Sequence, residues 1–289
     1  MRKLKSLLLL SVIGFAACET ETANVDVLGA NLSDTVTAEV AFEETEDVLD
    51  NIAIYSDSAF GIETTTSKAS DSKDSTYKKH GRSGYFKDCA DIVVEELDGT
   101  TTTTITFTED CEDRDGNVIS GTITKVKTES DNGKEKTVIV DGLMINGYVI
   151  NGTKTYVYTV SNANGNPEMM GSVNMSIETD EGTATKVGSR TVEITAGGDT
   201  DTCTDDEKTI TGSFVYTNAE GVENSVTITT DLVKPADCKY IASGIKVYTT
   251  EAGTVTLDYG DGTCDDVATK TDTDGTETEV TLGKRRKRH

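Results

Sequence analysis

Residues 100–116 read Thr-Thr-Thr-Thr-Thr-Ile-Thr-Phe-Thr-Glu-Asp-Cys-Glu-Asp-Arg-Asp-Gly, and apolar side chains alternate with threonines around Ile105 and Phe107. A period of two places successive side chains on opposite faces of a β-strand. Threonine is β-branched and suits a half-solvated pleated surface. The stretch therefore predicts a strand with one apolar and one wet face, followed by a turn at Asp115-Gly116.

The same alternation returns along the rest of the chain from about residue 90. The alternating apolar positions are Val173, Met175 and Ile177; Val192 and Ile194; Ile210, Phe214 and Tyr216; Val226 and Ile228; Ile245 and Val247; Val255, Leu257 and Tyr259; Val280 and Leu282. Asn-Gly and Asp-Gly pairs, which accept the positive φ of tight hairpins, separate these runs. They lie at 98–99, 115–116, 132–133, 146–147, 151–152, 164–165 and 274–275.

Together these signals predict an all-β domain over residues 85–283. Roughly a dozen short strands joined by hairpins make an antiparallel meander. Roughly one residue in six is threonine, far above ordinary usage, which favours one solvated face. The pattern leaves open whether the strands form a sandwich or a curved half-barrel.

Residues 34–84 have a different pattern and predict one N-terminal α-helix followed by a polar linker. Ala41, Thr45, Val48, Ile52 and Tyr55 recur at helical spacing and make one face, while acidic residues lie mostly off it. We expect this helix, over residues 34–56, to dock on the sheet; a helix that binds a partner protein is the alternative. Residues 57–84 show little periodicity.

The first eighteen residues follow the pattern of a secretory signal, with a basic start, a short apolar run and small residues before Cys18. The apolar run is too short to span a bilayer as a mature helix. We therefore expect residues 1–17 to be a signal peptide and residues 18–33 an acidic tether. Cys18 follows Ala16-Ala17 and resembles the cysteine of a bacterial lipobox, which predicts lipidation (palmitate among the acyl groups). Ordinary secretion is the alternative.

The chain has six cysteines, and an exported protein meets an oxidising compartment. A weak internal repeat places Cys89 and Cys111, and again Cys238 and Cys264, around similar strand and turn segments. The repeat suggests the disulfides Cys89–Cys111 and Cys238–Cys264, each tying a strand to the strand after next. Cys203 is then the free thiol.

The formal net charge is −24, and a cluster of basic residues occupies only the tail, residues 284–289. An acidic body repels nucleic acid and anionic lipid headgroups. We expect the tail to be a solvated end; contact with lipid phosphates or with the acidic body is the alternative.

Two C-terminal segments carry a family resemblance: CKYIASGIKV at residues 238–247 and TVTLDYGDGTCDD at residues 254–266. With the lipobox and the acidic helix, this order resembles a group of uncharacterised Bacteroidota lipoproteins. The first turn departs from that group, because Thr108-Glu109-Asp110 stands where an Asp-x-Gly run is expected. The resemblance covers most of the mature chain and implies an outer-membrane lipoprotein, but no particular activity.

Candidate catalytic chemistry is scarce. The only histidines are His80 and His289, and the sequence has no P-loop, dinucleotide fingerprint, nucleophile elbow or Cys-x-x-Cys pair. Tryptophan, which often lines sugar clefts, is absent, so paired carboxylates for glycoside hydrolysis are a weak alternative. The best metal hypothesis is calcium at one acidic turn, because calcium prefers oxygen ligands. Its candidate ligands are Asp258, Asp261, Asp265 and Asp266.

The sequence thus predicts a non-catalytic outer-membrane lipoprotein, held in the membrane by its N-terminal lipid and facing the cell surface. Its expected role is structural, adhesive or ligand-binding, with a protein or glycan partner and no resident cofactor. The alternative is a periplasm-facing carrier of lipid or a small hydrophobic ligand. A continuous apolar concave face favours the carrier, and a filled core favours the surface module.

Overall fold

The computed structural model describes residues 49, 77–80, 89–113, 116–179, 182–200 and 205–282. Apart from Leu49, these residues form β-strands and their connections. The strands are β1 (Tyr77–His80), β2 (Ala90–Leu97), β3 (Thr100–Glu112), β4 (Val118–Ser130), β5 (Gly133–Ile145), β6 (Tyr148–Thr159), β7 (Glu168–Thr179), β8 (Gly182–Ala196), β9 (Glu207–Thr217), β10 (Glu223–Lys234), β11 (Ser243–Thr250), β12 (Gly253–Asp261), β13 (Val267–Thr271) and β14 (Glu277–Thr281).

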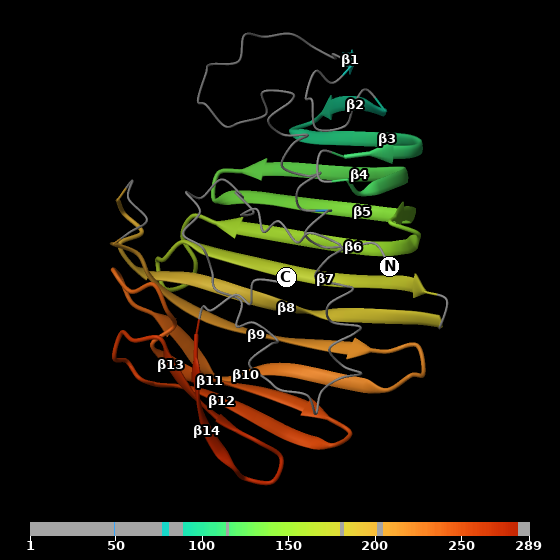
Figure 1. Cartoon of the computed structure of the whole chain (residues 1–289). Helices are drawn as coiled ribbons and strands as arrows, with labels where there is room; N and C mark the ends of the chain where they lie inside the picture. The colour runs from blue at the N-terminus through green and yellow to red at the C-terminus, as the bar shows by residue number, and fades with distance from the viewer. Residues whose placement is uncertain are drawn as a thin grey trace.

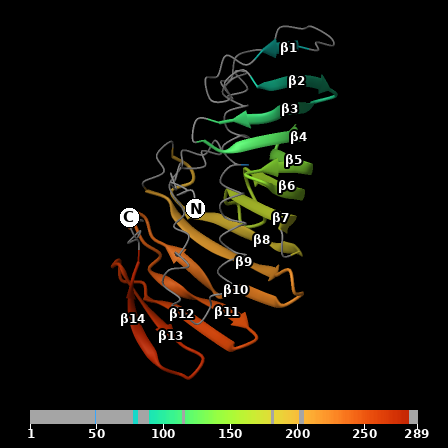
Figure 2. The ribbon, with the colours of Figure 1, turned by 45° about the vertical axis from the view of Figure 1, so that its right-hand side comes forward.

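All fourteen strands belong to one sheet, in which each strand pairs antiparallel with its neighbours in sequence. The strands follow one another in sequence order from β1 to β14, and the sheet is strongly curved (Figures 1 and 2). It is not closed, because β1 and β14 lie at opposite edges. The prediction of an all-β antiparallel meander is confirmed. No second sheet faces it in the described part of the chain, so the strands do not make a two-sheet sandwich.

Many strands are longer than the short strands that the sequence predicts, and β8 has fifteen residues. Hydroxyl and lysine side chains continue the strands beyond the apolar runs, so these runs mark only part of each strand. The sheet also begins earlier than expected, since β1 pairs with β2 within the stretch predicted as linker.

One face of the sheet, which we call the core face, carries the buried side chains. Register places Ile105, Ile123 and Val140 opposite one another on β3, β4 and β5. Each is at most 4% exposed. The row continues through Gly152 and Met175 on β6 and β7. The opposite face, which we call the outer face, carries mainly threonine, serine and acidic side chains.

Two local predictions are wrong. Ile245 and Val247 lie on the outer face, because the intervening Lys246 pairs with the buried Leu257 and so turns toward the core face. Asn151-Gly152 is not a turn but lies inside β6, where Gly152 pairs with Val140 and Met175. The side chain of Asn151 instead accepts a hydrogen bond from Gly142 N at the irregular point of β5, over 2.7 Å.

Both predicted disulfides are present, with Cα–Cα distances of 5.4 Å for Cys89–Cys111 and 5.7 Å for Cys238–Cys264. Their placement differs from the expectation of strands two apart. Cys89 precedes β2 and Cys111 lies in β3, so the first bridge closes the open end of a single hairpin. The second bridge does the same for the hairpin β11–β12. The repeated cysteine spacing therefore marks two equivalent hairpin staples.

The predicted N-terminal helix lies outside the described residues except for Leu49. The side chain of Leu49 is 2% exposed and belongs to the same hydrophobic cluster as the core face of the sheet. The predicted signal peptide, the tether with Cys18, Cys203, His80's side chain and the basic tail also lie outside what the structure describes.

Candidate functional site

The two faces of the sheet carry different charges. On β2–β14 every lysine and arginine lies on the core face, at positions in register with buried apolar residues. These eleven residues are Lys125, Lys127, Lys134, Lys136, Lys154, Lys186, Arg190, Lys208, Lys234, Lys246 and Lys270. Only two acids of these strands, Glu96 and Glu129, share that face. The core face is therefore basic within an acidic protein.

Several of these lysines are deeply buried. Lys125 is 2% exposed, Lys186 6% and Lys154 8%. Lys125 and Lys154 both lie opposite Val138, one on each neighbouring strand. Long aliphatic stems add apolar area to such a face while the ammonium groups seek polar or aromatic partners. The lysines are thus built into the core.

Aromatic rings on the same face lie near the ammonium groups. Lys186 Nζ is 5.4 Å from the ring centroids of both Phe214 and Tyr216, and Lys154 Nζ is 5.6 Å from that of Tyr156. The same contact recurs from Lys134 to Tyr158 and from Lys246 to Tyr248. Cations at this distance are attracted by the electron-rich ring face. Burial raises the pKa of the Tyr158 hydroxyl, as expected for a phenol in low-dielectric surroundings.

Ion pairs occur at the edges of the core face. Lys127 Nζ lies 2.6 Å from Glu129 Oε1, and Lys270 Nζ lies 2.6 Å from Asp272 Oδ1. The hydrogen bond from Lys127, together with its charge, holds the pKa of Glu129 below its usual range. Since Glu129 is largely exposed, this pair adds little to stability.

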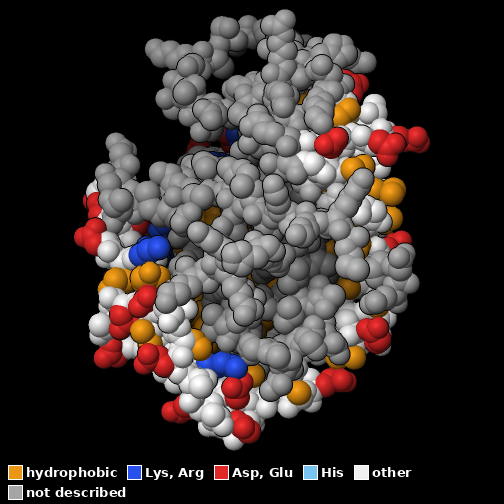
Figure 3. Space-filling view, viewed as in Figure 1, with side chains coloured by type: hydrophobic (Ala, Val, Ile, Leu, Met, Phe, Trp, Pro, Cys, Tyr) orange, Lys and Arg blue, Asp and Glu red, His pale blue; other side chains and the backbone are white. Residues whose placement is uncertain are grey.

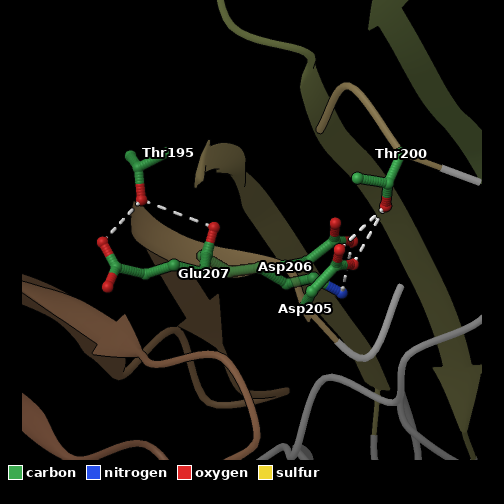
Figure 4. A network of polar contacts seen from close by, with 6 residues as sticks. Thr195, Thr200, Asp205, Asp206 and Glu207 are labelled. Atoms are coloured by element: carbon green, nitrogen blue, oxygen red, sulfur yellow. Dashed lines mark hydrogen bonds and ion pairs between the residues drawn. The ribbon is translucent and has the colours of Figure 1, made fainter. Parts of the chain in front are cut away.

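A buried charge pair lies at the start of β9, and Figure 4 shows one member, Asp206, with the neighbouring polar residues. Lys208 Nζ is 4.0 Å from Asp206 Oδ2, and both side chains are less than a tenth exposed. Burial raises the pKa of Asp206 and lowers that of Lys208, and in each case it outweighs the attraction of the partner. Around the pair, Thr200 donates to Asp205 at 3.0 Å and Thr195 donates to Glu207 Oε1 at 3.0 Å. The pair itself is therefore costly, and hydrogen bonds fix the acids beside it.

The outer face presents a row across the sheet in which nine of eleven side chains carry a hydroxyl group. Register places one row member on each strand from β3 to β13. The row consists of Thr102, Val126, Thr137, Thr155, Ser172, Ser189, Ser213, Thr227, Val247, Thr256 and Thr271. Neighbouring strands are about 4.8 Å apart, so adjacent hydroxyls interact, as Thr137 and Thr155 do at 3.1 Å. Apolar side chains are also exposed here, including the paired Val187 and Val215 at 48% and 39%.

No lysine or arginine of β2–β14 reaches the outer face. In the space-filling view, acidic side chains are frequent along the described margin, and Lys or Arg is visible at only a few places (Figure 3). Register places acids such as Glu135, Glu178 and Glu193 on the outer face, so this face is hydroxyl-rich and acidic, which suits many weak polar contacts with a neutral surface.

The predicted calcium ligands lie around one loop, but their oxygens serve the turn. Asp258 Oδ1 accepts from Gly260 N at 2.9 Å, and Asp265 Oδ1 accepts from Val267 N at 3.0 Å. Asp261 Oδ1 accepts from both the hydroxyl and the amide of Thr263, and these bonds lower the pKa of its carboxyl. Asp266 contributes its backbone carbonyl to Leu282 N. The described residues contain no group of three metal-binding side chains. The calcium hypothesis stays a prediction.

The basic core face was missed by sequence reasoning, although the sequence contains its signal. Lys125 stands two residues after Ile123, Lys136 two before Val138, and Lys208 two before Ile210. Each lysine is therefore in phase with the apolar positions of its strand. Lysine is normally expected to face solvent, so these positions were not counted toward the apolar face of their strands.

Comparison with known proteins finds no matching family model, no matching curated protein and no matching solved structure. Among the described residues no helix has the length and apolar character needed to cross a membrane.

Proposed function

We propose that the mature chain is a lipid-anchored, non-catalytic outer-membrane protein whose β domain acts as a structural or adhesive module at the cell surface. The observation that carries the proposal is the division of the sheet into two faces. Ile105, Leu143 and Leu257 of the core face are 0% exposed, so this face is filled as a core. The outer face is therefore the surface of the sheet that is available to bind a partner.

The outer face supports an adhesive role through its chemistry. A row of hydroxyls at strand spacing offers both donors and acceptors, and single contacts of this kind contribute little each. Many such contacts over a wide sheet give useful avidity when the anchored protein is dense on a membrane. Its acidic character disfavours anionic polymers, so a neutral glycan or a protein is the expected partner. The histidine-poor sequence supports a non-catalytic role.

The carrier of a lipid or small hydrophobic ligand is the second candidate. It is favoured by the continuity of the apolar core face over one open sheet, and by lysines that match an anionic headgroup. Native mass spectrometry of detergent-free protein tests it. A co-purified acyl lipid supports the carrier, and a ligand-free mass with a filled core supports the surface module.

Protease shaving of intact cells tests the surface location. A periplasmic protein that must survive intact serves as the control. Cleavage of the β domain under these conditions agrees with the proposal. Survival of the domain until the outer membrane is opened overturns the surface location and makes the carrier the leading hypothesis.

Extraction of membranes without detergent tests the lipidation of Cys18. Release of the native chain under these conditions contradicts lipidation, and Cys18→Ser is the matched variant that cannot be lipidated.

A further inference from the structure

Two adjacent rows of the outer face contain no charged side chain. The first is the row of mostly hydroxyl-bearing residues described above, and the second lies two residues away from it on each strand from β3 to β12. The second row consists of Thr104, Thr124, Ile139, Thr153, Asn174, Val187, Val215, Ser225, Thr249 and Thr254. We call the two rows together the neutral band. With strands about 4.8 Å apart, the band extends roughly 43 Å along the sheet.

Aliphatic side chains are exposed within the neutral band. Ile139 on β5, Val187 on β8 and Val215 on β9 are 38%, 48% and 39% exposed. Val187 and Val215 lie directly opposite each other on neighbouring strands. The centre of a protein interface is depleted of charge and gains most of its affinity from a few buried side chains. The neutral band therefore has the composition of an interface centre.

Acids surround the neutral band on the outer face. On one side, Glu135 lies two residues beyond the hydroxyl-bearing row. On the other side, Glu178 and Glu223 lie four and two residues beyond the second row. Glu95 ends the hydroxyl-bearing row on β2, where it pairs with Thr102. These four acids are exposed, and no lysine or arginine of β2–β14 shares their face, so the rim of the band carries one sign of charge.

The rim and the absence of aromatic rings select the class of partner. The band alone suits neutral groups, but covering the rim carboxylates with a neutral surface removes their water without replacing it. Lysine or arginine restores a charged hydrogen-bond partner to each carboxylate. All aromatic side chains of β2–β14 lie on the core face, so sugar rings find none to stack on here. A second copy of this face does not fit, because two acidic rims repel each other.

We propose that the neutral band is the docking site of a protein that presents aliphatic side chains surrounded by lysine or arginine. Val187 and Val215 contact the aliphatic centre of that partner, and Glu135, Glu178 and Glu223 pair with its basic rim. The inference rests on the proposed surface role, because it names the class of partner that the outer face binds. It narrows the choice between a glycan and a protein to a basic protein surface.

A synthetic peptide with leucines in its middle and lysines at both ends tests the chemistry of the partner. Fluorescence anisotropy measures its Kd for the purified mature chain. One control peptide has glycines in place of the leucines, and another has glutamates in place of the lysines. We expect the leucine–lysine peptide to bind at least about tenfold more tightly than either control. Equal binding of the glycine–lysine peptide overturns the proposal, because attraction to the net charge then suffices.

Substitution of the exposed valines tests whether the peptide lies on the neutral band. Val187→Thr together with Val215→Thr keeps β-branched side chains on both strands, and thermal unfolding checks that the fold is kept. This double variant should weaken binding of the leucine–lysine peptide about tenfold. Val160→Thr, at a side chain that is also 48% exposed but lies outside the band, is the control and should change the Kd little. An unchanged Kd in the double variant overturns the docking site.

Neutralising rim acids separates the rim from the net charge of the protein. Glu135→Gln with Glu178→Gln should weaken binding of the same peptide several-fold at low salt, and less at high salt, because exposed charges are screened. Glu220→Gln with Glu251→Gln, in exposed turns, changes the net charge equally and should have little effect. Equal weakening by the two pairs contradicts a specific role of the rim.

A neutral glucose oligosaccharide distinguishes failure of the partner class from failure of the surface role. If the oligosaccharide binds and loses affinity in the double valine variant while the leucine–lysine peptide does not bind, the basic protein partner is overturned and the adhesive role stands. Binding of neither probe also overturns the docking proposal. Protease shaving of intact cells reports the location of the domain independently of both results.

Discussion

Thr103 of β3 lies directly opposite Lys125 of β4 on the core face, and their side chains are 0% and 2% exposed. The hydroxyl of Thr103 is buried, and no hydrogen-bond partner for it is found in the described structure. Core-face positions thus tolerate polar atoms beside the lysines, at a cost in stability that substitution can measure.

Thr103→Val should raise the free energy of unfolding by about 1 kcal/mol, because it replaces an unsatisfied buried hydroxyl by a methyl group of the same shape. Urea denaturation of both proteins measures the difference. Thr103→Ser keeps the hydroxyl and loses the methyl, so it should be less stable than the native chain. Thr106→Val on the outer face, whose exposed hydroxyl lies 3.4 Å from that of Thr122, should change little. A destabilised Thr103→Val would mean that the hydroxyl has a partner.

Gly152→Ala should lower the free energy of unfolding by about 3 kcal/mol or more. Its φ is +128°, and an added Cβ would lie 2.2 Å from the carbonyl oxygen of Asn174 on the adjacent strand. Gly165→Ala is the control, because φ is +85° there and nothing lies within 4 Å of the added carbon. That substitution should cost only about 1 kcal/mol. Equal costs would contradict the close approach of β6 and β7.

Replacing Cys238 and Cys264 together by serine should lower the free energy of unfolding by about 3–4 kcal/mol, because a loop of this length is no longer closed in the unfolded chain. The bridge spans a sequence separation of 26 residues. Chemical denaturation with and without a thiol reductant measures the loss. Under reducing conditions, which also open Cys89–Cys111, the native protein and the double variant should have the same midpoint. Equal midpoints of the two proteins without reductant would argue against the second hairpin staple.

The pair Asp206–Lys208 should make stability depend on pH in a defined direction. Burial raises the folded pKa of Asp206 above 3.8, so the folded state holds this proton longer than the unfolded state does. Stability is therefore lost as pH rises from 3.8 through the folded pKa. Relative to Asp206→Asn, the native chain should lose stability over this acidic window and then stay level. A difference that grows in the opposite sense would show that attraction to Lys208 dominates.

The opposite sign applies to Lys208, whose folded pKa is lowered below 10.5 by burial. Its cost is present at neutral pH and is relieved as pH rises through the folded pKa. A neutral double variant, Asp206→Asn with Lys208→Met, should be as stable as the native chain or more stable by about 1–4 kcal/mol. Lys208→Met alone should be less stable than the double variant, because it leaves Asp206 buried without its cation.

Much of the fold follows from local sequence signals. The alternation around Ile105 and Phe107, and turns such as Asp98-Gly99 and Asn146-Gly147, predict the meander correctly, since these turn residues have positive φ in the structure. The single-sheet arrangement does not follow, because alternation reports one buried face and not what covers it. In β11 the buried residues are Gly244 and Tyr248, and Lys246 lies between them on the core face. The more hydrophobic Ile245 and Val247 lie on the outer face, so hydrophobicity alone assigns the wrong face of this strand to the core.

The candidate site was less predictable than the fold. Lys125, Lys154 and Lys186 are recognisable only once the phase of each strand is known, because a lysine at one apolar position carries no signal alone. Cross-strand rows such as Thr137 beside Thr155 depend on register, which local sequence does not specify. The cysteine repeat located both disulfides, but the hairpin that each one closes emerged only from the strand boundaries.

The central claim is that the lysine-bearing face is the filled core and the hydroxyl-bearing face is the one offered to partners. Pulse acylation of lysines in the folded mature chain, compared with the same pulse in denaturant, tests it most directly. We predict strong protection of Lys125, Lys154 and Lys186 and full reaction of Lys239 in the exposed loop. Equal reaction of all four lysines would contradict the claim, because an open basic face is what the carrier requires.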